Sequence, residues 1–468
     1  MKKNTSELAK GNIGKLLFKM SLPAILAQVV NLLYNMVDRM YIGRIPGEGA
    51  LALTGVGLVF PIIILITAFA ALVSMGAAPR ASIMLGRGDK EGAEKTLGNS
   101  FTALIIVSII LTAAILLFGK DIIMIFGGSD ATIGYALDYI SIYALGTIFV
   151  QMALGLNAFI TAQGFARVSM QTILIGAVLN IILDPIFIFT FNMGVKGAAF
   201  ATITSQGISA LWVLRFLLGQ KTMIKIKKEN LRLDKNIILP SLLLGLSPFI
   251  MQFTESILAV VFNTSLQKYG GDLAVGTMTI LTSVMQFSLL PLIGLTQGSQ
   301  PIISYNFGAG NLDRVKDTFK LLLKISLLYS TTLWLFIMLK PSIFAKIFTT
   351  DLELINMVIP SLRIFMSMSL LFSIQIACQQ TFIALDNAKT SIFLALLRKV
   401  ILLIPLIYIL PLFLENKVNA VFIAEPIADT LSVIITSIVS YISFKKLFNE
   451  KSKPYHNTLK KEDEKIVV

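Results

Sequence analysis

The chain has 468 residues, of which 55% are hydrophobic and 14% are charged, and its mean hydropathy is +0.80. Soluble proteins average roughly 25% charged residues. A soluble protein of this size could not cover so much apolar surface with so few charges. The composition therefore excludes a water-soluble protein and indicates one that is integral to a membrane.

The rarest residue types exclude several kinds of chemistry. The one histidine, His456, lies in a polar tail, and the one cysteine, Cys378, lies in an apolar run. Histidine metal sites, thiolate metal clusters and internal disulfides are therefore excluded. No nucleophile has a neighbouring base to activate it. We expect a protein that is not an enzyme and that needs no cofactor.

Apolar runs long enough to cross a bilayer, about 20 residues each, recur along the whole chain. The twelve runs are 16–43, 51–78, 96–118, 134–158, 169–191, 195–219, 238–266, 274–300, 317–340, 355–384, 390–413 and 418–444. The predicted fold class is therefore an all-α polytopic membrane protein with twelve transmembrane helices.

The distribution of basic residues predicts the orientation. An even number of spans places both termini on one side of the membrane. The termini and the turns of that side, including 389–399, hold 31 of the 40 lysines and arginines. By the positive-inside rule, both termini are predicted to be cytoplasmic, in a plasma (inner) membrane. Topology thus explains the net charge of +14, with membrane lipid as a partner and no nucleic acid.

A sequence repeat lies on either side of the basic stretch 220–236. At a shift of 222 residues, Gly76-x-x-Pro79 and Gly86-x-Gly88-Asp89 recur as Gly298-x-x-Pro301 and Gly308-x-Gly310-Asn311, and Ala166-Arg167-x-Ser169 recurs as Ala388-Lys389-x-Ser391. At a shift of 225, Leu22-Pro23 and Val37-Asp38 match Ser247-Pro248 and Phe262-Asn263. Parallel six-helix repeats predict two pseudo-symmetric lobes around a central cavity, as in alternating-access transporters.

The repeat also predicts the domain boundaries. We expect an N-terminal six-helix lobe at 1–219, a cytoplasmic linker at 220–236, a C-terminal six-helix lobe at 237–445 and a cytoplasmic polar tail at 446–468. We expect the protein to act as a monomer.

Carboxylates inside a bilayer are costly, so they usually serve a function or pair within the bundle. Asp38 lies near the end of the first predicted helix, with Tyr34 one turn earlier on the same face. Pro23 leaves the Lys19 carbonyl without its helical hydrogen bond and predicts a hinge. A hinged helix with a titratable acid is a candidate switching element. The alternative is that Asp38 only reaches the membrane interface.

Asn180 and Asp184 lie four residues apart on one face of the fifth predicted helix, and Pro185 follows directly. The proline frees the Ile181 carbonyl. An amide oxygen, a carboxylate and a spare carbonyl are hard donors that suit a small cation. The alternative is a proline-kinked helix with a capping asparagine.

Glu425 and Asp429 share a face of the last predicted helix in the same way. Because two like charges this close favour protonation of one of them, the pair is a candidate proton carrier. Equally, either acid is a candidate for binding substrate, or for pairing with Arg363 or Arg398. The residues alone leave these alternatives open.

The order of these features resembles the multidrug and toxic compound extrusion (MATE) family over about residues 12–445. The shared features are the Leu22-Pro23 opening of the first helix, Asn35-x-x-Asp38 near its end, and the repeated glycine–proline turns after the second and eighth helices. The resemblance implies an antiporter that exports toxic compounds, driven by an inward flow of Na⁺ or H⁺.

The resemblance also implies where the coupling ion binds. In the family, a first-half cation site is built from an aspartate of helix one, an Asn/Asp pair of helix five and a threonine of helix six. The matching positions for Na⁺ or H⁺ here are Asp38, Asn180, Asp184 and Thr202, with Tyr34 and Asn157 as expected neighbours.

The second half departs from the family pattern. Glu255 matches a functional glutamate of some members and is a candidate coupling or substrate residue, as are Glu425 and Asp429. Those members also carry an aspartate in helix ten, where this chain offers only Gln375, Gln379 and Gln380.

Buried acids and an apolar cavity favour small-molecule drugs, mainly organic cations, as substrates. Methionine and phenylalanine supply adaptable and stacking contacts. The candidate cavity residues are Met152, Phe159, Met251, Phe253, Met285 and Phe287. The alternative function is a lipid or lipid-linked oligosaccharide flippase. A flippase needs basic residues that face the cavity, and Arg363, Arg398 and Lys399 keep this alternative open.

Overall fold

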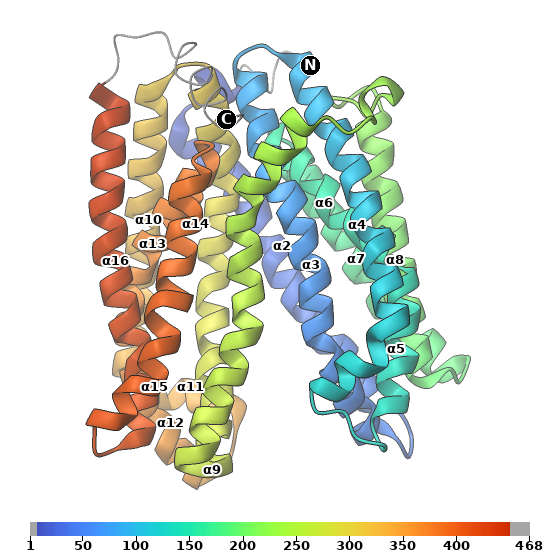
Figure 1. Ribbon diagram of the computed structural model, residues 1–468, viewed down its shortest axis with the longest axis vertical. Helices are drawn as coiled ribbons and strands as arrows, with labels where there is room; N and C mark the ends of the chain where they lie inside the picture. The colour runs from blue at the N-terminus through green and yellow to red at the C-terminus, as the bar shows by residue number, and fades with distance from the viewer. Residues whose placement is uncertain (1–6, 450–468) are drawn as a thin grey trace.

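The computed structural model describes residues 7–449, and every regular element in this range is helical (Figure 1). The helices are α2 (Ile13–Ile42), α3 (Gly49–Gly86), α4 (Lys90–Ile125), α5 (Ile133–Leu145), α6 (Thr147–Ala162), α7 (Ala166–Pro185), α8 (Gly194–Leu218), α9 (Lys235–Gly308), α10 (Leu312–Leu339), α11 (Pro341–Phe348), α12 (Leu352–Phe365), α13 (Ser369–Ala384), α14 (Ala388–Leu396), α15 (Ile404–Phe413) and α16 (Lys417–Asn449). Between them lie two π-helical turns, η1 (Ile186–Thr190) and η3 (Leu397–Leu403), and a 3₁₀ turn, η2 (Lys228–Asn230). His456 and most of the predicted tail 446–468 lie outside the described residues.

These helices confirm the twelve predicted spans. Within residues 7–449, nine helices are long and apolar enough to cross a membrane, and two bent pairs, α5 with α6 and α12 with α13, form further spans. The longest helix, α9, contains two spans because Gly271, at φ 61° and ψ −158°, breaks its helical path. A positive φ of this kind favours glycine. The short α11 is an element that the sequence did not predict.

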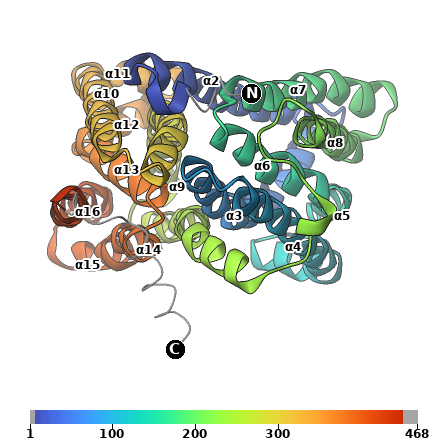
Figure 2. The same ribbon diagram turned by 90° about the horizontal axis from the view of Figure 1, so that it is seen from above.

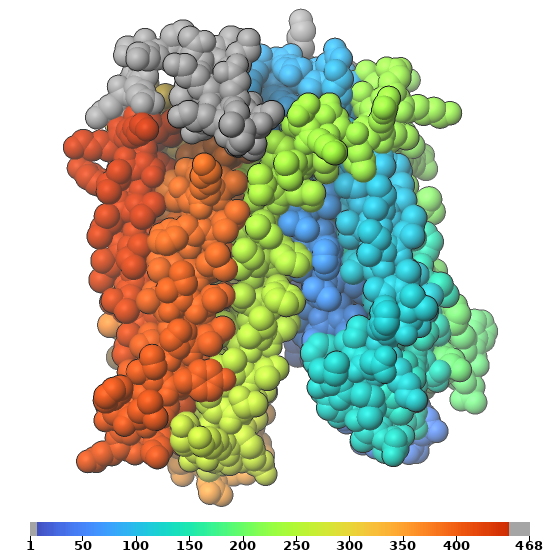
Figure 3. All heavy atoms as spheres, in the orientation of Figure 1, coloured from blue at the N-terminus to red at the C-terminus, as the bar shows by residue number. Residues whose placement is uncertain are grey.

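The spans form two lobes, as predicted (Figures 1 and 2). The first lobe contains α4 to α8 and the second contains α10 to α16, while α2, α3 and α9 lie where the lobes meet. We call the face where α2 begins and α16 ends the terminal face, and the opposite face the distal face. A cleft between the lobes, bordered by α9 on one side and by α3 to α5 on the other, widens toward the distal face (Figure 3).

The repeated glycines allow the lobes to approach closely near the terminal face. A Cβ atom added to Gly76 of α3 would lie 1.9 Å from the carbonyl oxygen of Ser241 in α9. No side chain is tolerated at that distance, so only glycine permits this helix contact. A Cβ atom added to three other glycines would lie equally close to a carbonyl oxygen. The distances are 1.8 Å from Gly245 to Leu72, and 2.0 Å both from Gly86 to Tyr305 and from Gly308 to Ile83.

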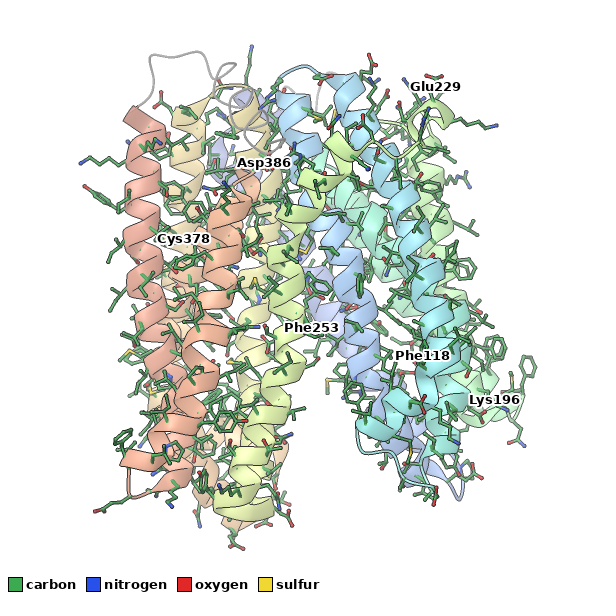
Figure 4. All side chains as sticks on the ribbon, viewed as in Figure 1. Phe118, Lys196, Glu229, Phe253, Cys378 and Asp386 are labelled. Atoms are coloured by element: carbon green, nitrogen blue, oxygen red, sulfur yellow. The ribbon has the colours of Figure 1, made fainter. Side chains whose placement is uncertain are left out.

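Polar contacts also join the lobes near the terminal face. Arg80 of α3 donates hydrogen bonds to both carboxylate oxygens of Asp386, at 2.9 and 2.8 Å, in the turn between α13 and α14 (Figure 4). Arg314 of α10 donates to the carbonyl oxygens of Leu8 and Gly11, at 3.2 and 2.8 Å. The segment that precedes α2 is therefore anchored on the second lobe.

The segment between α8 and α9 is bound to the first lobe. Oε1 of Gln163 accepts hydrogen bonds from the Thr222 hydroxyl and the Met223 backbone N–H, at 2.9 and 2.7 Å. The buried Glu94 pairs with Lys227 at 2.5 Å, and this hydrogen bond raises the pKa of Lys227. These contacts attach the connection to the first lobe up to the start of α9.

Candidate functional site

The four residues of the predicted first-half site come together from three helices. Asp38 lies near the distal end of α2, Asn180 and Asp184 lie in α7, and Thr202 lies in α8. Asn180, Asp184 and Thr202 are buried, Asp184 completely, and Asp38 is half-buried. The carboxyl groups of Asp38 and Asp184 lie close enough to influence each other electrostatically. Two acids of one site therefore face each other inside the first lobe.

Asn180 links the members of this group. Its Nδ2 atom donates hydrogen bonds to Asp184 Oδ1 at 3.2 Å and to Thr202 Oγ1 at 3.3 Å. The Thr202 hydroxyl donates in turn to the carbonyl oxygen of Ala198 at 3.0 Å. The Asn180 amide and the Thr202 hydroxyl therefore donate their hydrogen bonds within the group or to the backbone of α8, and not to the remaining acceptor oxygens.

Three oxygen atoms of the group are buried and accept no hydrogen bond from any residue that the structure describes. They are Asp38 Oδ1, Asn180 Oδ1 and Asp184 Oδ2. Each unpaired buried acceptor costs about 1–3 kcal/mol, and a buried carboxylate costs more. A small hard cation or a proton removes this cost, because it supplies positive charge to oxygen atoms that have no donor. The residues present therefore fit Na⁺ or H⁺.

Asp184 lies where the α-helix changes into a π turn. Helix α7 ends at Pro185, and the chain continues as the π turn η1. Because proline has no N–H, the carbonyl of Ile181 receives no helical hydrogen bond from it. Single π turns are frequent at functional sites. Pro23 lies within α2, which runs unbroken from Ile13 to Ile42.

Tyrosines surround the two acids, and the sequence analysis identified only one of them. Tyr34 of α2 lies close to both Asp38 and Asp184. Tyr139 of α5, which is buried, lies close to both Thr202 and Asp38. Tyr143 stacks on Tyr139, with ring centroids 6.0 Å apart. The available signal was the spacing of four residues between these two tyrosines, which places them on one helix face.

The expectation that Asn157 adjoins the first-half site needs a correction. Its Nδ2 atom donates to the carbonyl oxygen of Ser169 at 3.2 Å. Ser169 precedes Asn180 by eleven residues of α7, which is about 16 Å of helix. Antiparallel packing of α6 on α7 therefore places Asn157 toward the terminal face, away from Asp184.

The second lobe holds a different cluster of buried charges. Arg398 of η3 donates through Nη2 to Glu425 Oε1 and through Nε to Asp429 Oδ1, each at 2.6 Å. Lys399 pairs with Glu255 and donates to the carbonyl oxygen of Met251, the latter at 2.7 Å. All of these side chains are buried except that of Glu255, which is 53% exposed.

This cluster changes two interpretations of the sequence. Arg398 and Lys399 were counted with a cytoplasmic turn, but they lie about ten residues into a span, so they carry no topology signal. Of the two proposed partners for the acids of α16, Arg398 is the one that binds them. Arg363 instead donates to the carbonyl oxygen of Met338 at 3.2 Å.

The candidate cavity residues divide into exposed and buried sets. Phe253, on the cleft side of α9, and Phe287 are 43% and 62% exposed (Figure 4). Met152 and Phe159 are instead buried in the core of the first lobe, so the prediction that they line the cavity was wrong. Met251 and Met285 are partly buried within the second lobe. Helical periodicity could not tell a core face from a cavity face, since both are apolar.

Comparison with protein families decides the classification. The family model described as MatE matches residues 23–186 and 248–409, one block in each lobe. The chain belongs to the MATE family. The two blocks also agree with the repeat, because each covers the first five spans of its half.

Curated relatives and solved structures of MATE proteins match nearly the whole chain. The multidrug export protein MepA of Staphylococcus haemolyticus is 26% identical over 429 residues, which is 91% of this chain and 94% of that protein. MepA of Staphylococcus aureus (strain NCTC 8325 / PS 47) is 26% identical, over 92% and 95% of the two chains.

A MATE crystal structure in the bent conformation superimposes with a TM-score of 0.90, at 23% identity and over 96% and 99% of the two chains. A multidrug resistance MATE family transporter in an outward-facing conformation superimposes with a TM-score of 0.87, also at 23% identity, over 95% and 98%. At this level of identity, the structures establish the MATE fold for the described part of the chain.

Proposed function

We propose that this MATE protein is a cation-coupled antiporter that exports lipophilic, mostly cationic drugs and toxic compounds across the plasma membrane by alternating access. The names of the MepA relatives support multidrug export. The observation that carries the coupling is the set of three buried oxygen atoms without donors, on Asp38, Asn180 and Asp184. The coupling ion, Na⁺ or H⁺, is a transported substrate.

In this proposal the distal face is extracellular and the terminal face, with both chain termini, is cytoplasmic. The cleft opens toward the distal face, so the ion enters the first lobe from outside and binds between α2 and α7. Helix α2 then links ion binding to the second lobe. Its distal end carries Asp38, whereas Leu17 and Met20 at its other end pack in an apolar cluster of the second lobe with Leu295.

Substrate binding is proposed for the wall of the cleft formed by α9. Phe253 and Phe249 stack with their rings 5° from parallel and their centroids 5.9 Å apart. Phe69 of α3 packs edge-on against Phe249 from the other lobe, at 5.0 Å. An exposed ring with a stacked neighbour is a surface on which flat aromatic cations bind.

The test is ethidium uptake into inverted membrane vesicles, in which the cytoplasmic face is outside, with a Na⁺ gradient and a pH gradient imposed separately. We expect one gradient to drive transport and Asp184→Asn to abolish that dependence, because an amide cannot supply the charge that the ion compensates. Asp138→Asn is the matched control in the same lobe, since Asp138 is an exposed acid whose partner is Lys196. Gradient-driven ethidium uptake by Asp184→Asn vesicles at the wild-type rate would refute the proposed site.

The flippase alternative makes a different prediction in the same vesicles. A flippase for anionic lipid-linked substrates needs free basic groups in the cavity. Here Arg398 and Lys399 already pair with acids and with a backbone carbonyl. These pairings favour the drug exporter. Transbilayer movement of a fluorescent anionic phospholipid without ethidium uptake would favour the flippase.

A further inference from the structure

The charges of the second-lobe cluster do not balance. Three acids, Glu255, Glu425 and Asp429, meet two bases, Arg398 and Lys399. Each base is satisfied by its ion pairs, so the full ionised set has one negative charge in excess. Inside a bilayer an uncompensated charge is costly. The cluster is therefore short of one positive charge.

The excess charge centres on Glu425. This carboxylate lies in the electrostatic range of all four other groups, including two acids that repel it, whereas Asp429 interacts chiefly with Arg398. The charged neighbours come from α9, η3 and α16. In α10, Tyr329 faces the same space and donates its hydroxyl to the carbonyl oxygen of Ser288 at 3.2 Å. In the described parts of α12, α13 and α15, no further charged group interacts with Glu425.

A small cavity reaches this carboxylate. It has a volume of about 30 Å³ and lies between α9, α10, α12, α13, η3 and α16. Arg398, Glu425 and Asp429 form its polar end, and aromatic residues including Trp334 and Phe372 line the rest. The space holds roughly two water molecules, at 10–15 Å³ each. Drug-sized ligands need roughly 300–1,000 Å³. The cavity is therefore large enough for water beside Glu425 and too small for a drug molecule.

We propose that the second lobe contains its own proton-binding site, in which Glu425 takes up one proton from water in this cavity. The carboxylate oxygen gains the proton, a hydronium ion becomes water, and the five-charge cluster becomes neutral. Arg398 keeps its ion pair with Asp429 and its hydrogen bond to Oε1 of the now neutral Glu425, since the proton binds the other carboxyl oxygen. This site is separate from the coupling-ion site of the first lobe, and the inference holds whichever ion drives transport there.

The two tryptophans of the chain allow a direct test, because Trp334 lines the cavity and Trp212 lies in α8 of the first lobe. In full-length Trp212→Phe protein in detergent, the emission of Trp334 is titrated from about pH 4 to 10. We expect a single transition with the slope of one proton. We expect the transition to disappear in Glu425→Gln and to persist in the matched first-lobe variant Asp184→Asn.

Infrared spectroscopy separates protonation from a structural effect. A carbonyl stretch of a protonated carboxylic acid should appear with the same midpoint as the fluorescence transition and should be missing in Glu425→Gln. If Glu425→Gln does not fold, Glu425→Asp replaces it, with a displaced midpoint expected. A transition that survives in Glu425→Gln, or its absence from the Trp212→Phe protein, would overturn the proposal. A midpoint that moves by about one pH unit when Na⁺ replaces an inert cation would also overturn the proposal, since the site would then bind a metal ion.

Discussion

In the first lobe, Asp38 and Asp184 interact with each other, and neither forms an ion pair with any residue that the structure describes. In the second lobe, Glu425 and Asp429 both bind Arg398, and Lys399 neutralises Glu255. Arg39, next to Asp38 in sequence, points away and lies over the ring of Phe60. The first lobe thus leaves its acids available to a mobile cation, whereas the second lobe carries built-in counter-charges.

The repeat shows that this difference lies in the chemistry and not in the scaffold. At the shift of 222 residues, Asn180 and Asp184 correspond to Leu402 and Leu406, and Arg398 corresponds to Gly176. The glycines that bring the lobes together do recur in both halves. Duplication therefore preserved the residues that shape helix contacts, while each lobe acquired its own buried polar groups.

The largest predicted effect is on the built-in counter-charge. We expect Arg398→Ala to lower the free energy of unfolding by about 3–5 kcal/mol, because two buried carboxylates lose their partner. Thermal unfolding in detergent measures this loss. Neutralising the acids as well, with Glu425→Gln and Asp429→Asn, should restore most of the stability. Equal stability of Arg398→Ala and wild type would show that the cluster is solvated, and the contrast between the lobes would fail.

The second prediction concerns the shared scaffold. We expect Gly76→Ala to disfavour the state with a closed terminal face by about 1–3 kcal/mol, because its methyl group would overlap the backbone of α9. Distances between spin labels on α3 and α9 near the terminal face should lengthen. Gly57→Ala in the same helix is the control, since no atom lies within 4 Å of a Cβ there. Unchanged distances in Gly76→Ala would argue that close packing at this glycine does not keep the terminal face closed.

The third prediction tests whether a neutralised acid still influences ligands. Glu255 is half exposed and pairs with Lys399, so Glu255→Gln removes a negative charge next to the cleft and leaves Lys399 without its carboxylate partner. Cationic dyes should then bind more weakly than neutral dyes of similar size, by about 1–2 kcal/mol. Fluorescence titrations with matched dyes measure the difference. Equal losses for both kinds of dye would mean that Glu255 supports structure only.

The smallest predicted effect is at the surface of the first lobe. Lys196 and Asp138 form an ion pair at 3.4 Å, with side chains 55% and 47% exposed (Figure 4). We expect Lys196→Ala to change the free energy of unfolding by no more than about 1 kcal/mol, since exposed pairs are screened by solvent. A thermal unfolding curve recorded beside that of Arg398→Ala gives the comparison. If Lys196→Ala lost as much stability as Arg398→Ala, burial could not explain why the two ion pairs differ.

The first-half site was predictable from sequence to a large extent. Spacing along a helix placed Asn180 and Asp184 on one face, and the family resemblance added Asp38 and Thr202 from distant helices. Tyr139 was missed because an aromatic residue in an apolar span gives no sign of which neighbour its hydroxyl meets. Asn157 was placed wrongly because a family pattern names a helix and does not give the depth of a residue within it.

The sequence by itself determined the membrane class, the twelve spans and the repeat, because these depend on composition and on local hydrophobic patterns. Even the long helix α9 was divided correctly, near Gly271, by polar residues between two apolar runs. The tertiary structure alone decided which charges meet. Pairing of Arg398 with Glu425, of Lys399 with Glu255 and of Arg80 with Asp386 joins residues from different helices. Such contacts depend on how helices rotate and cross, and these geometric relations leave no periodic trace in the sequence.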